Sequence, residues 1–318
     1  MASPVIVSQG DLSGAGWYLF KRDIVPLKPD TTIIVVGDKT NSKIQGINYV
    51  SDIRDIDLAS KEIYLLHREK IIDSKPGTPT QDTSVASYEN FIRSLKYWSI
   101  VKKSALLTLP VSKEMIMKAG IKFSGHTEII GQHQESKTFL CMYSRKLITV
   151  LLTNHIPLKK TSAALKKVDY DELTSSLLRF LKLLGNQKPV AMLGYNPHAG
   201  EGGKIGEEET FLKKKISEMR KAGLKIDGPF PADSYFMNQF YERYGLSLAC
   251  YHDQGLIPFK ALSGLKGVNI TLGVSQLRVS PDHGTAYASL VKKEKLSSEG
   301  VKSALKFAIK WGEKWVQR

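Results

Sequence analysis

The chain has 318 residues, of which 42% are hydrophobic, and both values are ordinary for a globular protein. This length accommodates two domains, or one large α/β unit with two lobes. No apolar run reaches the roughly 18 residues of a membrane span, and the N-terminus lacks the basic segment of a secretory signal. Because two cysteines cannot form a disulfide framework, we expect a reduced, cytoplasmic protein that has no membrane partner.

The charge is strongly basic, with 46 Lys and Arg against 31 Asp and Glu and a formal net charge of +15. Such a balance would suit a nucleic-acid binder. However, the lysines are spread along the chain in groups such as Lys213-Lys214-Lys215, without a helix-turn-helix, zinc-finger or RNA-binding signature. We therefore expect solvated helix faces, a bias toward small anionic ligands and no nucleic-acid partner. A non-catalytic protein that binds metal or polyanions is the alternative.

Short β-branched runs alternate with helical patterns, which predicts parallel strands joined by crossover helices. In chain order, the predicted strands are Val5–Val7, Thr32–Val36, Glu62–Leu66, Ala105–Leu109, Ile148–Leu152, Val190–Leu193 and Leu246–Cys250. The turn formers of Asp73–Ser84 predict a surface loop. The clearest helix spans Asp169–Leu184, where Asp169 and Glu172 resemble a capping box, and a final helix begins at about Ser298.

Three histidines each follow the carboxyl end of a predicted strand. His155 comes after Ile148–Leu152, His198 after Val190–Leu193 and a short turn, and His252 after Leu246–Cys250. Ligands bind at this edge of an open α/β sheet. Three neutral imidazoles from loops suit a divalent metal with open positions for substrate, although three unrelated loop histidines are the simpler alternative.

Three other segments concentrate polar residues. Asn196–Gly203 places a histidine, a carboxylate and three glycines within eight residues, and glycines allow close backbone approach. Gly125–Glu128 is a second cluster that could equally be a helix cap. The third runs from Gly267–Gly273 through Arg278 to Ser280–Thr285. Arg278 suits bidentate binding of a phosphate or carboxylate, while an isolated arginine would more simply form a surface ion pair.

Taken together, these segments resemble the 4-hydroxythreonine-4-phosphate dehydrogenase family of pyridoxal phosphate biosynthesis. The resemblance rests on seven motifs that follow one another in order: GHTE (Gly125–Glu128), TNHIPL (Thr153–Leu158), NPHAGEGG (Asn196–Gly203), GPFPAD (Gly228–Asp233), YHDQGLIPFK (Tyr251–Lys260), GVNITLG (Gly267–Gly273) and SPDHGTA (Ser280–Ala286). The N-terminal third resembles the family less, through Gly10-Asp11 and through TLPVSK (Thr108–Lys113).

The resemblance implies a two-lobed α/β/α fold of the isocitrate/isopropylmalate dehydrogenase type, with a cleft between the lobes. We expect residues 1–124 and 266–318 to form the cofactor-side lobe, and residues 125–265 to form the metal-binding and dimerisation lobe. The family's metal ligands correspond to His155, His198 and His252, in a site shared between the subunits of a homodimer. The metal is zinc, cobalt, manganese or magnesium.

The family's substrate contacts correspond to His126, Thr127, Lys260, Asn269 and Arg278. The resemblance implies that NAD or NADP is held by loops that include Asp282, His283 and Gly284, since no GxGxxG follows a strand. Candidate proton acceptors are Asp253 and Lys113, although Asp253 could instead orient a histidine.

The implied reaction is NAD(P)-dependent oxidation of 4-phosphooxy-L-threonine, followed by decarboxylation to 3-amino-2-oxopropyl phosphate. The same chemistry on another phosphorylated sugar acid, 4-phospho-erythronate or 4-phospho-threonate, is the alternative. It is raised by departures from the family pattern: the family's GDPAGIGPE-like loop reads GDLSGAGWY at Gly10–Tyr18, and its TAPINK reads TLPVSK. The bulk of Trp17 would then narrow the pocket or replace a polar contact.

Overall fold

The computed structural model describes residues 3–315, except for the side chain of residue 238, and divides into two compact units. Unit 1 comprises the described residues up to Glu135 and those from Val274 onward, and unit 2 comprises Ser136–Gly273. None of the helices in this described part of the chain is long and apolar enough to cross a membrane. Both cysteines, Cys141 and Cys250, are free and buried.

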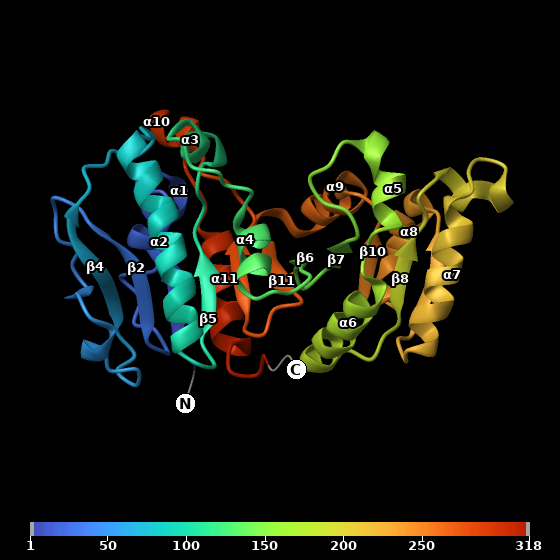
Figure 1. Cartoon of the computed structure of the whole chain (residues 1–318), viewed down its shortest axis with the longest axis horizontal. Helices are drawn as coiled ribbons and strands as arrows, with labels where there is room; N and C mark the ends of the chain where they lie inside the picture. Colours follow the sequence, from blue (N-terminus) through green and yellow to red (C-terminus); the bar gives the residue numbers. More distant parts are fainter. Residues whose placement is uncertain (1–2, 316–318) are drawn as a thin grey trace. The chain divides into compact units, whose positions relative to one another are not determined.

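Unit 1 is a parallel α/β layer structure. Its strands lie in the order β3 (Asn48–Val50), β4 (Ile63–Ile71), β2 (Ile33–Lys39), β1 (Val5–Ser8), β5 (Ala105–Thr108) and β12 (Arg278–Pro281). Strands β1 and β5 are buried at every residue, as expected of parallel strands covered on both faces. Helix α2 (Gln81–Ile100) packs against β1, β2 and β5, and α11 (Glu299–Trp311) packs against β5 and β12 (Figure 1).

The other α-helices of unit 1 are shorter. They are α1 (Ala15–Asp23), α3 (Lys113–Lys118), α4 (His126–His133) and α10 (Tyr287–Val291). The predicted last helix is confirmed as α11, with Ser298 at its N-cap position.

Unit 2 has a mixed sheet. Its strands lie in the order β11 (Val268–Leu272), β6 (Phe139–Tyr143), β7 (Ile148–Leu151), β10 (Leu246–Ala249), β8 (Val190–Leu193) and β9 (Ile226–Phe230). Its α-helices are α5 (Thr161–Leu165), α6 (Tyr170–Leu184), α7 (Glu208–Lys221), α8 (Ala232–Phe236) and α9 (His252–Ser263). The core of this unit joins side chains of β6, β7, β8 and β10 to Tyr235, Leu256 and Phe259.

All seven predicted strands are confirmed, and so is the predicted helix α6. The Asp169 side chain accepts a hydrogen bond from the backbone N–H of Glu172 at 3.0 Å, and Gly185 ends the helix in the left-handed region with φ 65°. Leu173, Leu177 and Phe180 are fully buried along one stripe.

The predicted strands pair with one another in parallel, whereas β6, which was not predicted, runs antiparallel to both β7 and β11. Only residues 144–147 separate β6 from β7, and a parallel crossover needs a far longer connection. Ser144 closes this short turn, with its backbone N–H donating to the Leu147 carbonyl at 3.0 Å.

The surface loop predicted at Asp73–Ser84 is wrong in its last four residues, because α2 begins at Gln81. Thr80 and Thr83 form a capping box, in which each side chain accepts a hydrogen bond from the other residue's backbone N–H. The turn formers at the end of this segment therefore start a helix.

The chain passes from one unit to the other at positions that differ from those expected from the resemblance, which were 124/125 and 265/266. The observed divisions fall after Glu135 and after Gly273. Strand β11 belongs to unit 2 because it pairs with β6 along five residues of each strand, while α4 belongs to unit 1.

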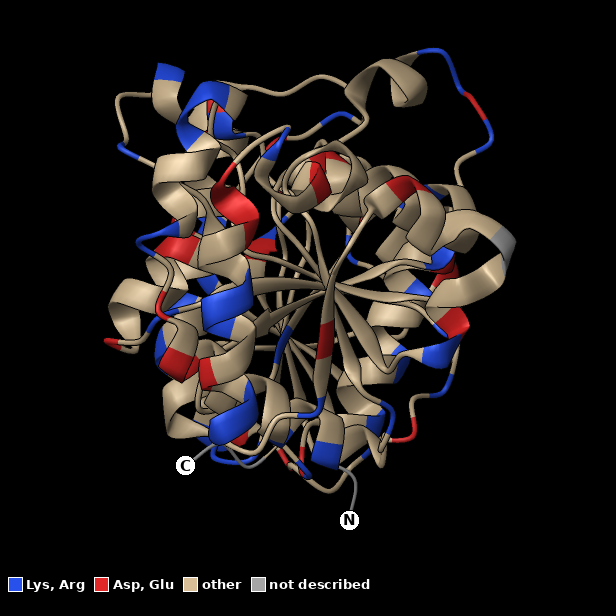
Figure 2. Ribbon diagram, turned by 90° about the vertical axis from the view of Figure 1, so that its right-hand side faces the viewer, with Lys and Arg blue, Asp and Glu red and all other residues tan. Residues whose placement is uncertain are grey.

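Basic and acidic residues are interspersed on the helices and loops visible in Figure 2. Helix α7 illustrates the mixture, since Glu208 and Glu209 open it and Arg220 and Lys221 close it. This distribution places charges of the favourable sign at each end of the helix dipole.

Candidate functional site

The three candidate metal ligands lie in the segments that follow three strands at one edge of the unit 2 sheet. Strand β10 pairs in parallel with β7 on one side and with β8 on the other. His155, His252 and His198 follow β7, β10 and β8, respectively, so that all three are placed just beyond the carboxyl ends of adjacent strands. The sheet edge predicted from the sequence is therefore confirmed for these residues.

His155 and His252 lie next to each other. Their ring centroids are 5.3 Å apart, and the rings are tilted by 46°. The Nδ1 atom of His252 lies 2.7 Å from Oδ1 of Asp253. When Nδ1–H donates to this carboxylate, Nε2 is left with its lone pair available, which is the arrangement of a metal-binding imidazole oriented by a carboxylate.

His198 lies in an unusual left-handed turn. Five consecutive residues, from His198 to Gly202, have φ between 43° and 75°, and three of them are not glycine. Such backbone costs about 1–3 kcal/mol at each strained residue and persists only where its surroundings enforce it. The turn therefore requires strong ties to the rest of unit 2.

Glu209, on the first turn of α7, supplies these ties. Its Oε1 accepts the backbone N–H of Asn196 at 2.7 Å, and its Oε2 accepts the Asn196 side-chain amide at 2.9 Å. Glu208 accepts the same amide at 2.9 Å. A Cβ on Gly200 would come within 2.5 Å of Oε2 of Glu209, so the turn fits closely over this carboxylate.

The described residues of one chain do not assemble a complete metal site. No group of three or more His, Cys, Asp or Glu side chains among them is arranged to hold a metal ion. The structure thus brings His155 and His252 together and does not add His198 to them within the same chain.

Unit 1 holds a second set of candidate residues around Arg278. Arg278, at the start of β12, is only 2% exposed, and its guanidinium donates to the Thr108 hydroxyl at 2.6 Å. Burial lowers the pKa of Arg278 to about 10, against the opposite influence of the Glu128 carboxylate. The guanidinium consequently stays charged at neutral pH, which makes it a strong site for an anion.

His126 is the first residue of α4, directly after Gly125, whose φ of 139° is disfavoured for residues with a side chain. Its ring contacts Phe91 and Phe123 edge to face, at centroid distances of 4.4 and 5.6 Å. Its Nε2 is sealed from solvent without a hydrogen-bond partner. Burial, together with the charge of Arg278, lowers the pKa of His126 well below its usual value.

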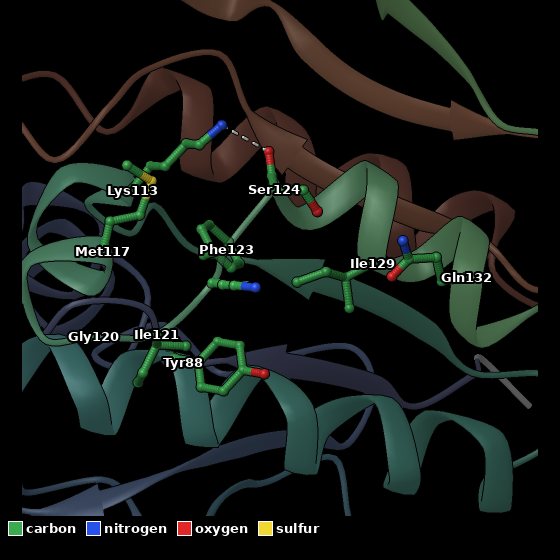
Figure 3. Close-up of a pocket in the computed structure, with 10 residues that line it drawn as sticks. Tyr88, Lys113, Met117, Gly120, Ile121, Phe123, Ser124, Ile129 and Gln132 are labelled. Atoms are coloured by element: carbon green, nitrogen blue, oxygen red, sulfur yellow. Dashed lines mark hydrogen bonds between the residues drawn. The ribbon is translucent and has the colours of Figure 1, made fainter.

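Lys113 and Thr127 complete the candidates near this helix. Thr127 is half-buried beside His126 on the first turn of α4. Lys113 lines a pocket of about 690 Å³, whose other lining residues are Tyr88, Met117, Gly120, Ile121, Lys122, Phe123, Ser124, Ile129 and Gln132 (Figure 3). The Lys113 Nζ donates to the Ser124 carbonyl at 3.0 Å, which ties the lysine side chain to the segment that leads into α4.

The candidates Lys260 and Asn269 belong to unit 2. Lys260 lies exposed on the last turn of α9. Asn269 lies half-buried on β11, where its side-chain oxygen is sealed from solvent without a hydrogen-bond partner. A buried amide oxygen of this kind is costly unless something binds it.

The candidate cofactor residues Asp282, His283 and Gly284 follow β12 in a loop. The His283 ring lies 3.0 Å from the carbonyl of Gly284 through Nδ1, and its Nε2 is sealed without a partner. Because β1, β5 and β12 are parallel neighbours, this loop shares one sheet edge with Gly10–Gly14 and with the segment before Lys113.

Trp17 does not narrow a pocket, contrary to our expectation. It lies inside α1, is 1% exposed and stacks on Phe20 at a centroid distance of 5.7 Å. The altered end of the Gly10–Tyr18 loop thus adds an apolar residue to the core. Sequence reasoning missed Glu209 and Thr108 as supporting residues, and only the run of three glutamates at 207–209, after the glycine-rich turn, offered a signal.

The fold is that of the isocitrate dehydrogenase-like α/β dehydrogenases. A solved 4-hydroxythreonine-4-phosphate dehydrogenase from Klebsiella pneumoniae superposes with a TM-score of 0.78, covering 98% of this chain and 99% of that one at 24% identity. The family model of the pyridoxal phosphate biosynthetic protein PdxA matches residues 28–308, so the chain belongs to the PdxA family.

Two similar proteins carry different enzyme names. The 4-hydroxythreonine-4-phosphate dehydrogenase of Sulfurihydrogenibium sp. is 33% identical over 292 residues, which cover 88% of this chain and 90% of the relative. The D-threonate 4-phosphate dehydrogenase of Pectobacterium atrosepticum is 29% identical over 302 residues, covering 90% and 93%. The chain is accordingly an oxidoreductase of a dehydrogenase family, as the motifs indicated.

Replacing Glu209 tests how the left-handed turn is held. In Glu209→Ala, the two Asn196 donors lose a buried acceptor, so the free energy of unfolding in urea should fall by about 1–3 kcal/mol. Glu208→Ala is the matched control, because it removes one bond from a half-buried carboxylate and should cost clearly less. Equal losses in the two variants would contradict this role for Glu209.

His126 should make the stability of the protein depend on pH. The unfolded chain binds a proton at His126 below its ordinary pKa of 6.5, while the folded chain does so only at much lower pH. The free energy of unfolding should therefore decline as pH falls below 6.5, by at most about 1.4 kcal/mol per pH unit from this residue.

The variant His126→Gln, which cannot take up a proton, should reduce that decline when urea unfolding is compared at successive pH values. The exposed His133→Gln on the same helix serves as the control. An unchanged pH dependence in His126→Gln would show that the histidine is accessible to protons in the folded state.

Proposed function

We propose that the protein catalyses NAD(P)-dependent, divalent-metal-dependent oxidation of 4-phosphooxy-L-threonine, followed by decarboxylation to 3-amino-2-oxopropyl phosphate. The secondary alcohol loses a hydride to the nicotinamide and its hydroxyl proton to a base, and the β-keto acid then releases carbon dioxide. The family supports an NAD-type cofactor and a small phosphorylated substrate. The observation that carries the proposal is the buried, charged Arg278 guanidinium at the edge of the unit 1 sheet.

Arg278 binds the phosphate or carboxylate of this substrate in the proposal. A guanidinium in a low-dielectric surrounding attracts a multiply charged anion more strongly than one in water. His126 suits the same ligand as a neutral hydrogen-bond partner, since its lowered pKa keeps a second cation away from Arg278. Thr127 lies beside it, and Lys260 and Asn269 are the further substrate contacts that the resemblance implies.

The donor set of unit 2 fits a divalent metal in part. Two neighbouring imidazoles, His155 and His252, provide nitrogen ligands, and Asp253 orients the second of them. His198 of a second copy would complete the set, which agrees with a homodimer whose metal site is shared. When bound, the metal supplies a Lewis acid that polarises a substrate oxygen.

In this proposal the side chain of Lys113, in its neutral amine form, accepts the proton of the substrate hydroxyl. Asp253 is engaged with His252 at 2.7 Å and therefore serves as the orienting carboxylate. Lys113 lines the Figure 3 pocket, and its Nζ donates a hydrogen bond to the Ser124 carbonyl. The NAD(P) cofactor is assigned to the loop that contains Asp282, His283 and Gly284.

A second candidate substrate is 4-phospho-D-threonate, or the related 4-phospho-erythronate. It is favoured by the similarity to the D-threonate 4-phosphate dehydrogenase of Pectobacterium atrosepticum. Such acids carry a hydroxyl group where 4-phosphooxy-L-threonine carries an ammonium group, so the two substrates differ by one positive charge. The oxidation and the decarboxylation are otherwise the same.

Formation of reduced nicotinamide with 4-phosphooxy-L-threonine, after chelation and re-addition of divalent metals, tests the proposed activity. We expect turnover that requires metal and exceeds turnover of the two phosphorylated sugar acids. A larger kcat/KM with 4-phospho-D-threonate would assign the second substrate. Absence of turnover with all three substrates would contradict the dehydrogenase proposal.

His198→Ala should remove a metal ligand. Metal affinity, measured by calorimetric titration of the chelated protein, should fall by more than the roughly 10–100-fold that loss of an orienting partner costs. Asp253→Asn should show that smaller loss, because it weakens only the orientation of His252. Unchanged metal affinity in His198→Ala would contradict the role of this histidine.

A further inference from the structure

Asp11 joins two segments of unit 1 that are far apart in the sequence. It follows β1 and is 1% exposed. Its Oδ1 accepts the backbone N–H of Ser13 at 2.8 Å, and its Oδ2 accepts the phenolic hydroxyl of Tyr287 at 2.9 Å. Tyr287 is the first residue of α10, directly after the candidate cofactor loop.

Backbone hydrogen bonds reinforce this junction. The N–H of Ala15 donates to the Thr285 carbonyl at 2.8 Å, and the N–H of Gly77 donates to the Ser13 carbonyl at 2.8 Å. Gly77 also fits closely against α10, because a Cβ there would come within 2.7 Å of Val291. Three separate loops therefore meet at the start of α10.

Helix α10 is a short segment near the surface. The helix has only five residues, and none of them is buried. It follows Ala286, which adopts a left-handed conformation with φ 45°. Since none of its side chains is fully buried, the hydrogen bonds to the Asp11 loop help to decide where the segment lies.

The Asp11–Tyr287 hydrogen bond is partly buried, with the Asp11 carboxylate on its buried side. Burial raises the pKa of Asp11 above its ordinary value, although hydrogen bonds from Ser13, Tyr287 and Thr83 act in the other direction. Burial and the neighbouring Asp11 carboxylate raise the pKa of Tyr287 as well. The phenol thus remains protonated and donates, and removing it leaves a buried oxygen with one partner fewer.

We infer that Asp11 and Tyr287 form a positioning pair that fixes the 282–285 loop in the conformation that binds the NAD(P) cofactor. This inference rests on the proposed function, which assigns the cofactor to that loop. Tyr287 is accordingly a positioning residue that acts through the backbone of the loop. The Gly10–Gly14 turn, which departs from the family pattern at Leu12, holds the cofactor segment in this protein.

Tyr287→Phe removes the hydroxyl and keeps the ring, so it tests the pair directly. The dissociation constant of NAD, or of NADP if that cofactor is preferred, should rise about tenfold, the effect expected for loss of one hydrogen bond to a charged group. KM for the cofactor should rise in parallel, with little change in kcat. Amide hydrogen exchange of residues 283–291 should accelerate in the absence of any ligand.

Tyr49→Phe is the matched control. Tyr49 lies on strand β3 of the same unit, and its hydroxyl also takes part in a hydrogen bond, which it accepts from the backbone N–H of Ile44 at 2.8 Å. It should leave cofactor affinity and exchange of residues 283–291 unchanged. Equal cofactor affinity in Tyr287→Phe and the unaltered protein would overturn the inference while leaving the dehydrogenase activity intact. An unaltered protein that binds neither NAD nor NADP would instead overturn the proposed function, and the inference with it.

Discussion

In each unit, strands that are buried along their whole length pair in parallel, so their carboxyl ends share one edge of the sheet. Every loop that leaves those ends is then placed beside the others without any specific contact having to bring them together. Unit 2 uses this constraint to gather three histidine loops, and unit 1 uses it to gather the loops after β1, β5 and β12. What remains for individual side chains is to fix each loop, which Glu209 and Asp11 do through buried carboxylates.

The two units differ in the side chains that they offer to a charged ligand. Unit 2 presents imidazole side chains at the edge of its sheet, and imidazole is a ligand that suits divalent transition metals. Unit 1 buries a guanidinium at Arg278 and places an uncharged imidazole, His126, close to it. One unit is therefore suited to a cation and the other to an anion, which matches the proposed substrate and its metal ion.

The central strands could be predicted from the sequence because each is a short run of branched apolar residues, such as Val190–Leu193. Two of the strands that escaped prediction carry residues that weaken such a run: β12 ends in a proline and begins with Arg278, and β9 contains Gly228 and Pro229. Their extended form is fixed by pairing with distant strands, which no local pattern records. In the same way, the positions of the candidate site residues followed from strand ends, whereas their partners Thr108 and Glu209 depended on tertiary contacts.

The turn around His198 also restricts how this sequence can change over time. Gly200 has no room for a Cβ because Glu209 lies beneath it, and Glu209 in turn is held there by both donors of Asn196. A larger residue at position 200 would be tolerated only after the carboxylate had been shortened, and shortening it first would release the asparagine. The three positions are thus expected to vary together or not at all, so natural drift at this turn would require simultaneous substitutions.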